Sequence, residues 1–371
     1  MSRRTTFRRI AFEPDGQARY ACRWCGRQVV SREPAQALEC GCRPVQDQWG
    51  RVRPRGDRRR PAPTPRPARL TGKLAVCTCY FNPQRYQTRP ANFARFRDAA
   101  IHQGADLWAI EAETGEPWEV EEVPGLHVVR LAMDSVLWQK ERLLNILFDQ
   151  LPAEYDRVAW VDGDILFDNP DWVGQTAAEL EQYPVIQPLA DSLWLNRHGT
   201  PEPCRPNQLT RQSIAYRLHL GQEVHLGKGH PGFAWAARRD ALREIGGLYD
   251  RHVLGSGDSI ASIGFCGPFT HPYLDRFAGK FRDVMKAWCA RARQVVGGSV
   301  GYVPGTIRHL WHGERANRRY DDRIHRLALA GFNPDEHLEL GPSGLWQWTD
   351  AAPTELRKLV EDYFDVRRED G

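Results

Sequence analysis

Two carboxylates, Asp162 and Asp164, stand one residue apart at the end of an apolar run. The run, residues 158–161, predicts a short buried strand, and ligands of open α/β sheets bind at the carboxyl ends of such strands. Two carboxylates at one strand end are costly unless a positive charge lies between them. Mg²⁺ or Mn²⁺ carrying a diphosphate supplies that charge, because these cations prefer hard oxygen ligands. Gly163 would let the backbone turn between them, although the tripeptide is equally typical of a plain Asp-Gly turn.

Three side chains later in the sequence have types suited to the same chemistry. Asp258 follows a Gly-Ser-Gly sequence at a predicted helix start, where it acts as a base or caps the helix. His309 and His312 are three residues apart after a predicted strand. This spacing is typical of metal ligands and also of chance pairs in surface loops.

Two residues of the first half are candidates for contacting a ligand. Lys140 lies in a predicted helix, where it either meets a phosphate or sugar or is an exposed helix lysine. Phe81 ends the first predicted strand of the main domain, where it either lies against a planar base or packs in the core.

Strands and helices alternate through the middle of the chain, and this order must position the candidate residues. Strands are predicted at 74–81, 107–110, 128–131, 158–161 and 185–189, and helices at 89–104, 135–150, 171–183 and 239–245. The alternation predicts a doubly wound α/β sheet. Cys77 and Cys79 alternate along the first strand, so we interpret them as strand residues rather than metal ligands.

Residues 1–50 carry a different metal-binding pattern. Cys22 and Cys25 form a CxxC pair, and Cys40 and Cys42 form a CxC pair further on. Four thiolates from two such pairs would make a closed tetrahedral Zn²⁺ site, which a segment this short needs because it builds little core of its own. A redox-active CxxC and a set of unused thiols are the alternatives. We predict structural zinc here.

Charge is divided unevenly along the chain. Residues 1–73 hold 18 Lys and Arg against 6 Asp and Glu, whereas the rest of the chain holds 33 against 41. Residues 51–72 are rich in Pro and Arg and predict an extended, disordered linker, whose arginines either follow a phosphate backbone or keep the spacer solvated. The basic N-terminus lacks an apolar core and no apolar run is long enough to span a bilayer, so we expect a cytoplasmic protein without a membrane span.

Taken in order, these motifs resemble the GT-A glycosyltransferases, which use nucleotide-sugar donors. The Asp-x-Asp strand resembles their metal motif, and the Gly-rich block 229–258 resembles the carboxyl half of galactosyltransferase-like members. The His309–His312 pair resembles the later element that completes the metal shell. Relatives often carry two or three consecutive acids at the base position, whereas Asp258 stands alone before Ser259.

The resemblance implies a GT-A fold, a Rossmann-like mixed α/β sheet flanked by helices, over about residues 73–349. Together with the patterns above, it divides the chain into four parts. We expect a zinc-ribbon-like module at 1–50, an Arg- and Pro-rich linker at 51–72, the GT-A domain at 73–349 and a C-terminal helical tail at 350–371.

The resemblance also implies a metal-dependent transfer of a sugar to an acceptor hydroxyl, with inversion. Asp258 would be the base. The metal would be Mn²⁺ or Mg²⁺, with Mn²⁺ favoured because histidine joins the carboxylates among its implied ligands Asp162, Asp164, His309 and His312. A nucleotide-sugar donor, preferably a UDP-sugar, would be contacted by Phe81, Lys140, Asp162, Gly232 and Trp235.

The basic N-terminal part favours a polyanionic acceptor bound through residues 1–72, for example DNA that carries a hydroxymethylated base. One alternative is a glycosyltransferase for cell-surface or exopolysaccharide glycans. Another is a nucleic-acid-binding protein that works through its zinc module and arginines, with an inactive GT-A body.

Overall fold

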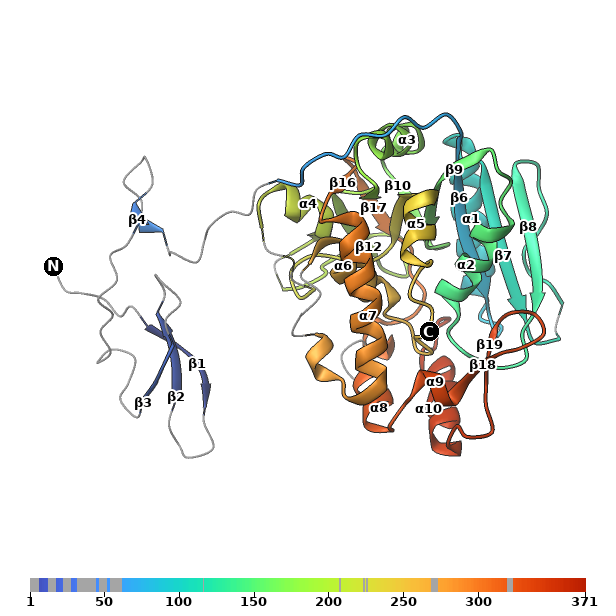
Figure 1. Cartoon of the computed structure of the whole chain (residues 1–371). Helices are drawn as coiled ribbons and strands as arrows, with labels where there is room; N and C mark the ends of the chain where they lie inside the picture. Colours follow the sequence, from blue (N-terminus) through green and yellow to red (C-terminus); the bar gives the residue numbers. More distant parts are fainter. Residues whose placement is uncertain are drawn as a thin grey trace. The chain divides into compact units, whose positions relative to one another are not determined.

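The computed structural model describes residues 62–371, except residues 116, 207, 223, 225, 268–272 and 319–322. Before residue 62 it describes the backbone of five short strands. The chain forms two compact units, Met1–Arg60 and Pro61–Gly371. Figure 1 labels helices and strands of both units.

The first unit contains an antiparallel sheet of three strands and a separate strand pair. The sheet has the order β1-β2-β3, and the pair is β4-β5. Their bounds are β1 (Phe7–Phe12), β2 (Ala18–Cys22), β3 (Gln28–Ser31), β4 (Val45–Gln46) and β5 (Val52–Arg53). Cys25, Cys40, Cys42 and the side chain of Cys22 lie outside the described residues, so the zinc site stays a prediction.

The second unit is organised around a seven-stranded sheet of order β16-β11-β15-β9-β6-β7-β8. The strands β9, β6, β7 and β8 run parallel, whereas β15 is antiparallel to both of its neighbours. The predicted mixed sheet is therefore confirmed. The strand bounds are β6 (Lys73–Phe81), β7 (Leu107–Glu113), β8 (Leu126–Ala132), β9 (Tyr155–Val161), β11 (Val185–Gln187), β15 (Ala234–Arg238) and β16 (Val300–Tyr302).

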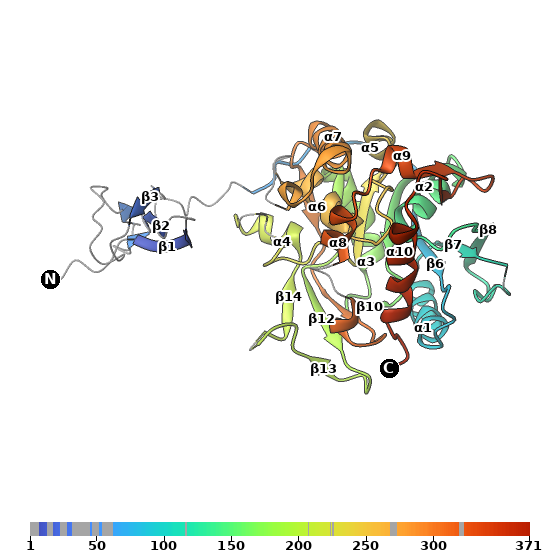
Figure 2. The ribbon, with the colours of Figure 1, turned by 90° about the horizontal axis from the view of Figure 1, so that it is seen from below.

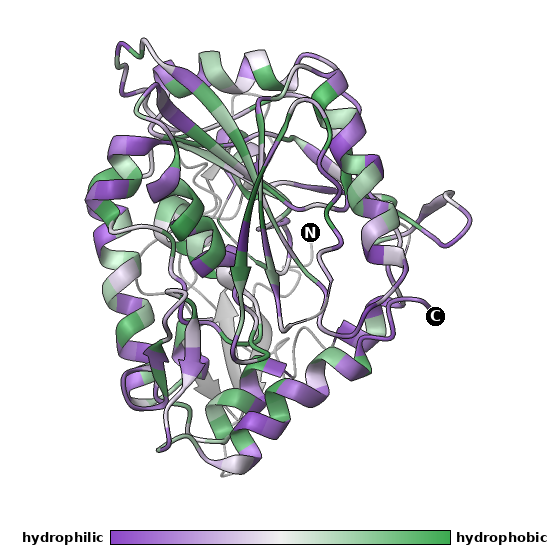
Figure 3. Cartoon of the chain, turned by 90° about the vertical axis from the view of Figure 1, so that its right-hand side faces the viewer, coloured by the Kyte–Doolittle hydropathy of each residue, from purple (hydrophilic) through white to green (hydrophobic). Residues whose placement is uncertain are grey.

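Helices cover both faces of this sheet, since successive residues of a strand point to opposite sides. On β9, Val158 and Trp160 join one buried cluster with α2, α5, α6, α7 and α10, whereas Ala159 and Val161 join the other with α1 and α3. In Figure 3 the central strands are largely green and the helices are striped green and purple, as expected for amphipathic helices. The helices are α1 (Thr88–His102), α2 (Lys140–Gln150), α3 (Trp172–Gln182), α4 (Ile214–His219), α5 (Arg239–Ile245), α6 (Gly257–Cys266), α7 (Gly279–Val296), α8 (Arg323–Leu329), α9 (Pro334–His337) and α10 (Thr354–Val366). Among the described residues, none of the helices has the length and apolar character needed to cross a membrane.

A second, smaller sheet pairs the strand that follows the Asp-x-Asp turn with strands from distant parts of the chain (Figure 2). In it β10 pairs antiparallel with β17, and Ile165 lies opposite His309. Its strands are β10 (Ile165–Phe167), β12 (Asp191–Leu195), β13 (Pro201–Glu202), β14 (Thr210–Gln212) and β17 (Thr306–His309). A further antiparallel pair consists of β18 (Leu338–Leu340) and β19 (Trp346–Trp348).

One predicted helix is shorter than its sequence pattern indicated. The prediction was 135–150, but α2 begins at Lys140. The preceding residues make tertiary hydrogen bonds instead: the Gln139 side-chain amide exchanges two with the backbone of Trp346, and the Trp138 N–H donates to Val253 O. This start places Lys140 in the first turn of the helix.

Both ends of the second unit extend beyond the predicted domain, 73–349. Part of the predicted linker lies along α3, because the N–H groups of Arg66 and Ala68 donate to Gln182 O and Glu181 O. At the other end α10 buries Val360 and other apolar residues in the core, so the predicted tail is part of this unit.

We predict that Arg239 fixes the end of α2 against the start of β9. Its guanidinium is buried and donates to four backbone carbonyls, those of Phe148, Leu151, Pro152 and Tyr155. Arg239→Met keeps the length but leaves these acceptors without a donor, at about 1–3 kcal/mol for each buried group that water does not reach. The expected result is a loss of about 3 kcal/mol or more in the free energy of unfolding, measured by urea denaturation.

The matched control is Arg243→Met, because Arg243 lies on the same helix with an exposed side chain. It should change the free energy of unfolding by about 0.5 kcal/mol or less. Equal effects of the two substitutions would contradict the anchoring role of Arg239.

Candidate metal and catalytic site

The Asp-x-Asp turn joins β9 to β10, as the apolar run predicted. Its backbone is tied to the neighbouring strand segment, since the Asp162 N–H donates to Phe233 O at 2.8 Å. Gly163 does not have the positive φ that would require glycine. A Cβ at Gly163 would lie 3.0 Å from Phe93 Cδ2, so the reason for glycine is the close approach of α1.

Three side chains that offer metal-ligating atoms converge beside this turn: Asp164, His309 and His312. The His309 and His312 Nε2 atoms are 3.2 Å apart, and Asp164 Oδ2 lies 2.9 Å from His312 Nε2. Asp164 Oδ1 lies 3.9 Å from His309 Nε2. These are three of the four predicted metal ligands, brought together by the pairing of β10 with β17.

The donor atoms of this group fit a divalent cation. Both imidazoles are buried, and Asp164 Oδ1 is buried without a hydrogen-bond partner among the described residues. Burial lowers the pKa of His309 well below its usual value, with Asp164 opposing the shift and Arg318 adding to it, which favours a neutral ring with a lone pair to offer. Burial opposes ionisation of Asp164, but His312 and His309 hold its pKa below the usual range. A mixed nitrogen and oxygen set of this kind suits Mn²⁺.

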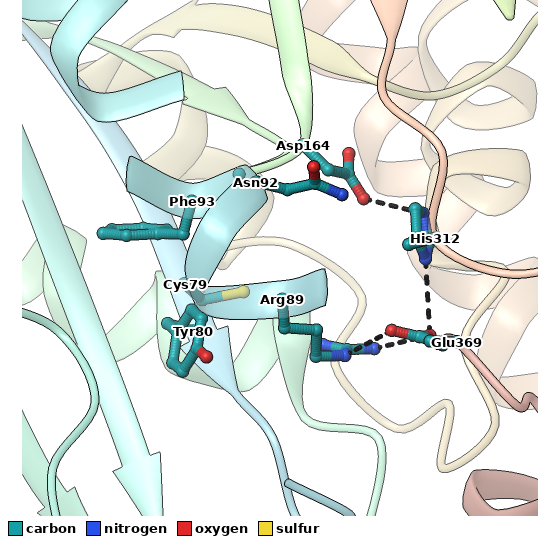
Figure 4. A pocket seen from close by; sticks show the side chains of 9 residues that line it. Cys79, Tyr80, Arg89, Asn92, Phe93, Asp164, His312 and Glu369 are labelled. Atoms are coloured by element: carbon teal, nitrogen blue, oxygen red, sulfur yellow. Dashed lines mark hydrogen bonds and ion pairs between the residues drawn. The ribbon is translucent and has the colours of Figure 1, made fainter. Parts of the chain in front are cut away.

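Two further charged residues contact His312. The Arg318 guanidinium donates to His312 Nε2 at 2.6 Å, and the Glu369 carboxylate lies 3.4 Å from His312 Nδ1 (Figure 4). Neither residue was predicted from the sequence. The pocket in front of His312 is lined by Cys79, Tyr80, Arg89, Asn92, Phe93, Gly163, Asp164, His312 and Glu369.

Lys140 joins two carboxylates beside the metal-ligating group. Its Nζ lies 2.5 Å from Asp162 Oδ1 and 3.1 Å from Asp258 Oδ2, and the residue is 8% exposed. The alternative of an exposed helix lysine is therefore wrong. Burial favours the neutral amine, but the two aspartates raise the pKa of Lys140 well above its usual value. The lysine is thus a fixed positive charge between two acids.

Asp162 pairs with this lysine and is not part of the converging group, although it was predicted as a ligand. Burial raises the pKa of Asp162 to about 7, with Asp258 and Asp164 adding to the effect and Lys140 opposing it. The two acids of the Asp-x-Asp turn therefore have different surroundings.

Asp258 does not cap α6, so the capping alternative is wrong. The N-cap position is Ser256, at a positive φ of 77°, and Asp258 lies in the first turn with its carboxylate turned to Lys140. A Cβ at Gly232 would lie 2.7 Å from Asp258 Oδ2. Glycine is thus required at 232 because the carboxylate rests against its backbone.

Glu141 is a further acid of this site, and the sequence analysis did not identify it. It is buried, and a Cβ at Gly257 would lie 2.1 Å from its Oε1. Burial raises the pKa of Glu141 to about 8, with Lys140 opposing and Asp258 adding to the rise. The only signal in the sequence was its position next to Lys140 in the predicted helix 135–150.

Two residues predicted to contact the donor are buried side chains of the core. Phe81 is 3% exposed and packs edge-on against Trp138 and Phe364. Trp235 is completely buried, with its indole N–H donating to Pro231 O at 2.7 Å. Burial favours the core-packing alternative for Phe81, and the donor contact of Trp235 stays a prediction.

No protein-family model matches the chain, and no curated protein is similar to it. Some solved structures are similar to it at low sequence identity. The catalytic domain of Drosophila beta1,4galactosyltransferase 7 has 12% identity and a TM-score of 0.35, over 78% of this chain and 99% of that one. The mannosyltransferase PcManGT from Pyrobaculum calidifontis has 14% identity and a TM-score of 0.40, over 73% of this chain and 64% of that one. Glucosyl-3-phosphoglycerate synthase from Mycobacterium tuberculosis has 14% identity and a TM-score of 0.39, over 80% of this chain and 96% of that one. We take the function from the side chains of the site rather than from these likenesses.

We predict that Asp164, His309 and His312 bind one Mn²⁺. Asp164→Asn removes the only carboxylate charge of the group and His312→Ala removes a ligand, so each should abolish measurable Mn²⁺ binding, followed by electron paramagnetic resonance of the free ion. The far-UV circular dichroism should be unchanged, because neither side chain belongs to the apolar core.

His325→Ala is the control, because His325 is exposed on α8. It should bind Mn²⁺ as the unaltered chain does. If Asp164→Asn and His312→Ala also bind with unaltered affinity, the metal lies elsewhere.

Proposed function

We propose that the chain is a metal-dependent glycosyltransferase that moves a sugar from a nucleotide-sugar donor to an acceptor hydroxyl. The observation that carries this proposal is the meeting, at the end of β9, of two groups with different chemistry. One is the metal-ligating group of Asp164, His309 and His312, and the other is the Lys140-bound pair of Asp162 and Asp258. A leaving diphosphate needs the first, and an attacking hydroxyl needs a base such as those in the second.

Mn²⁺ held by Asp164, His309 and His312 would supply positive charge that neutralises the leaving diphosphate. The chain's own residues prepare the other half of the reaction. Asp258 is one quarter exposed, at 26% of its side chain, so an acceptor hydroxyl can reach it. Lys140 holds the Asp258 carboxylate in place and also pairs with Asp162. The Asp258 carboxylate still has a lone pair that can accept the proton of the hydroxyl.

Attack by that hydroxyl on the anomeric carbon in one displacement would invert its configuration. We prefer a UDP-sugar as the donor, in a GT-A arrangement of the second unit. Support for the arrangement is the placement of the acids at the carboxyl end of a parallel strand in a mixed sheet.

For the acceptor we propose a polyanion, with DNA bearing a hydroxymethylated base as the first candidate. The support is the charge division: residues 1–73 hold 18 basic against 6 acidic residues, and the remainder 33 against 41. A polyanion would therefore be attracted to the N-terminal part. Cell-surface or exopolysaccharide glycans are the alternative acceptors. A nucleic-acid-binding protein with an inactive body is disfavoured, because such a body has no use for the buried ligands Asp164, His309 and His312.

We predict that Asp258 is the base. Asp258→Asn keeps the shape and leaves Lys140 paired with Asp162, but its amide accepts no proton at neutral pH. Transfer should fall by about 10² to 10⁴-fold, the general-base contribution, with donor affinity kept. Release of nucleoside diphosphate from a panel of nucleotide sugars, with Mn²⁺ and with EDTA, measures it.

The control is Asp283→Asn, because Asp283 is 61% exposed and pairs only with the neighbouring Arg282 among the ion pairs of the described residues. It should keep the full rate. A full rate in Asp258→Asn would mean that another acid is the base, with Glu141 the next to test.

We predict that the first unit serves the acceptor and not the donor. Removing residues 1–60 cuts at the boundary between the two units and leaves the docked residues 62–72 in place. Hydrolysis of the donor should be unchanged within about two-fold, while transfer to hydroxymethylated DNA should fall steeply. Binding of that DNA by the full chain should weaken strongly between 50 and 200 mM salt, by about 10³-fold or more if six or more phosphates are contacted.

Saccharide acceptors tested beside the DNA decide between the two acceptor classes. Transfer to saccharides alone, or full activity on DNA after the removal, would contradict a polyanionic acceptor.

A further inference from the structure

The end of the chain reaches the metal-ligating group from the side opposite to Asp164. Glu369 Oε1 lies 3.4 Å from His312 Nδ1, and the residue is 1% exposed (Figure 4). The same carboxylate is paired with Arg89, at 2.6 Å, and with Arg367. Glu369 is thus a buried acid whose position is fixed by two arginines.

The two ring nitrogens of His312 face different groups. Nε2 lies 2.9 Å from Asp164 Oδ2 and 3.2 Å from His309 Nε2, whereas Nδ1 lies 3.4 Å from Glu369 Oε1. A histidine that binds a cation through Nε2 carries its N–H on Nδ1, where this N–H can donate to a carboxylate. Glu369 is placed to accept that hydrogen bond.

The backbone beside His312 is shaped to receive the end of the chain. Gly313 has a φ of +81°, and a Cβ there would lie 2.7 Å from Arg368 O and 2.9 Å from Glu369 Cα. A side chain at this position would push the terminal segment away from His312. Glycine is thus required both for the backbone conformation and for the close approach.

Contacts on either side of Glu369 hold the terminal segment against the start of α1. The C-terminus lies close to this helix (Figure 2). The Asp370 carboxylate accepts from the N–H groups of Gln87 and Thr88, at 3.0 and 2.9 Å. The Tyr86 hydroxyl contacts Phe364 O at 2.8 Å. The terminal segment is thus packed against the second unit by specific hydrogen bonds.

We infer that Glu369 is a positioning residue of the metal site, a carboxylate that holds His312 with its Nε2 directed to the ion. The inference rests on the proposed function, which supplies the metal. A carboxylate behind a metal-bound histidine fixes the orientation of the ring and raises its basicity, and its loss costs about 10- to 100-fold in metal affinity. The last residues of the chain therefore belong to the metal site, although they are far from Asp164 in the sequence.

The test is the affinity of the full chain for Mn²⁺ alone, without donor or acceptor, measured by electron paramagnetic resonance. Glu369→Gln keeps the shape but removes the charge, and should raise the Mn²⁺ Kd by about 10- to 100-fold. The absorption spectrum of bound Co²⁺ should also change, because it reports the bond from the ion to His312. Glu369→Asp keeps the charge one methylene further away, so its Kd should lie between the two, and it replaces Glu369→Gln if that variant does not fold.

Asp370→Asn is the matched control. It weakens the same terminal segment at α1 but leaves Glu369 beside His312, so both the Mn²⁺ Kd and the Co²⁺ spectrum should be those of the unaltered chain. If it weakens Mn²⁺ as much as Glu369→Gln does, only docking of the segment matters, and the inference is overturned.

His312→Ala separates this inference from the proposed function. If His312→Ala abolishes Mn²⁺ binding while Glu369→Gln and Glu369→Asp keep the unaltered Kd and Co²⁺ spectrum, the positioning role is wrong and the metal site stands. If His312→Ala also keeps the unaltered Kd, the metal site itself is wrong.

Discussion

The crowding of negative charge at the end of β9 is the constraint on which the rest of the site depends. Glu141 is buried there, and Asp162, Asp164 and Asp258 are only about one quarter exposed, so an unpaired charge is costly. Lys140 neutralises Asp162 and Asp258 from inside the protein. Asp164 instead faces two imidazoles, which are weak partners when neutral and good ligands when a cation is present. One positive charge of the site is thus the Lys140 side chain, and the other would be supplied by the metal ion at Asp164.

Close packing at the backbone holds these charges in place. Gly232, Gly257 and Gly313 have different neighbours, but each has polar atoms of a distant segment within 3 Å of where a Cβ would be. A methyl group at any of them would move a carboxyl group or the chain end, because interiors have no spare volume to absorb it. Glycine here serves the approach of two segments, and only at Gly313 does a positive φ add to the requirement.

The polar groups of the site come from segments that are far apart in the sequence. Arg89 on α1 and Glu369 after α10 meet behind His312, which follows β17. Because of these contacts, a shift of the segment that carries Glu369 would change the position of the metal ligand His312. The arrangement also places buried charges in pairs, where the loss of one member leaves the other unpaired. The strength of the fold and the chemistry of the site thus depend on the same contacts.

The sequence by itself determined the alternating strands and helices of the second unit and the residue types at the end of β9, because apolar periodicity and side-chain chemistry are properties of neighbouring residues. Through the resemblance it also indicated Asp164, His309 and His312 as metal ligands, together with Asp162. Only the tertiary structure decided which partner each acid has. Lys140 meets Asp162 because α2 begins where Gln139 bonds to another segment, and no local pattern reports that bond. Glu369 reaches His312 for the same reason: its position is set by contacts between segments hundreds of residues apart, which a linear pattern does not contain.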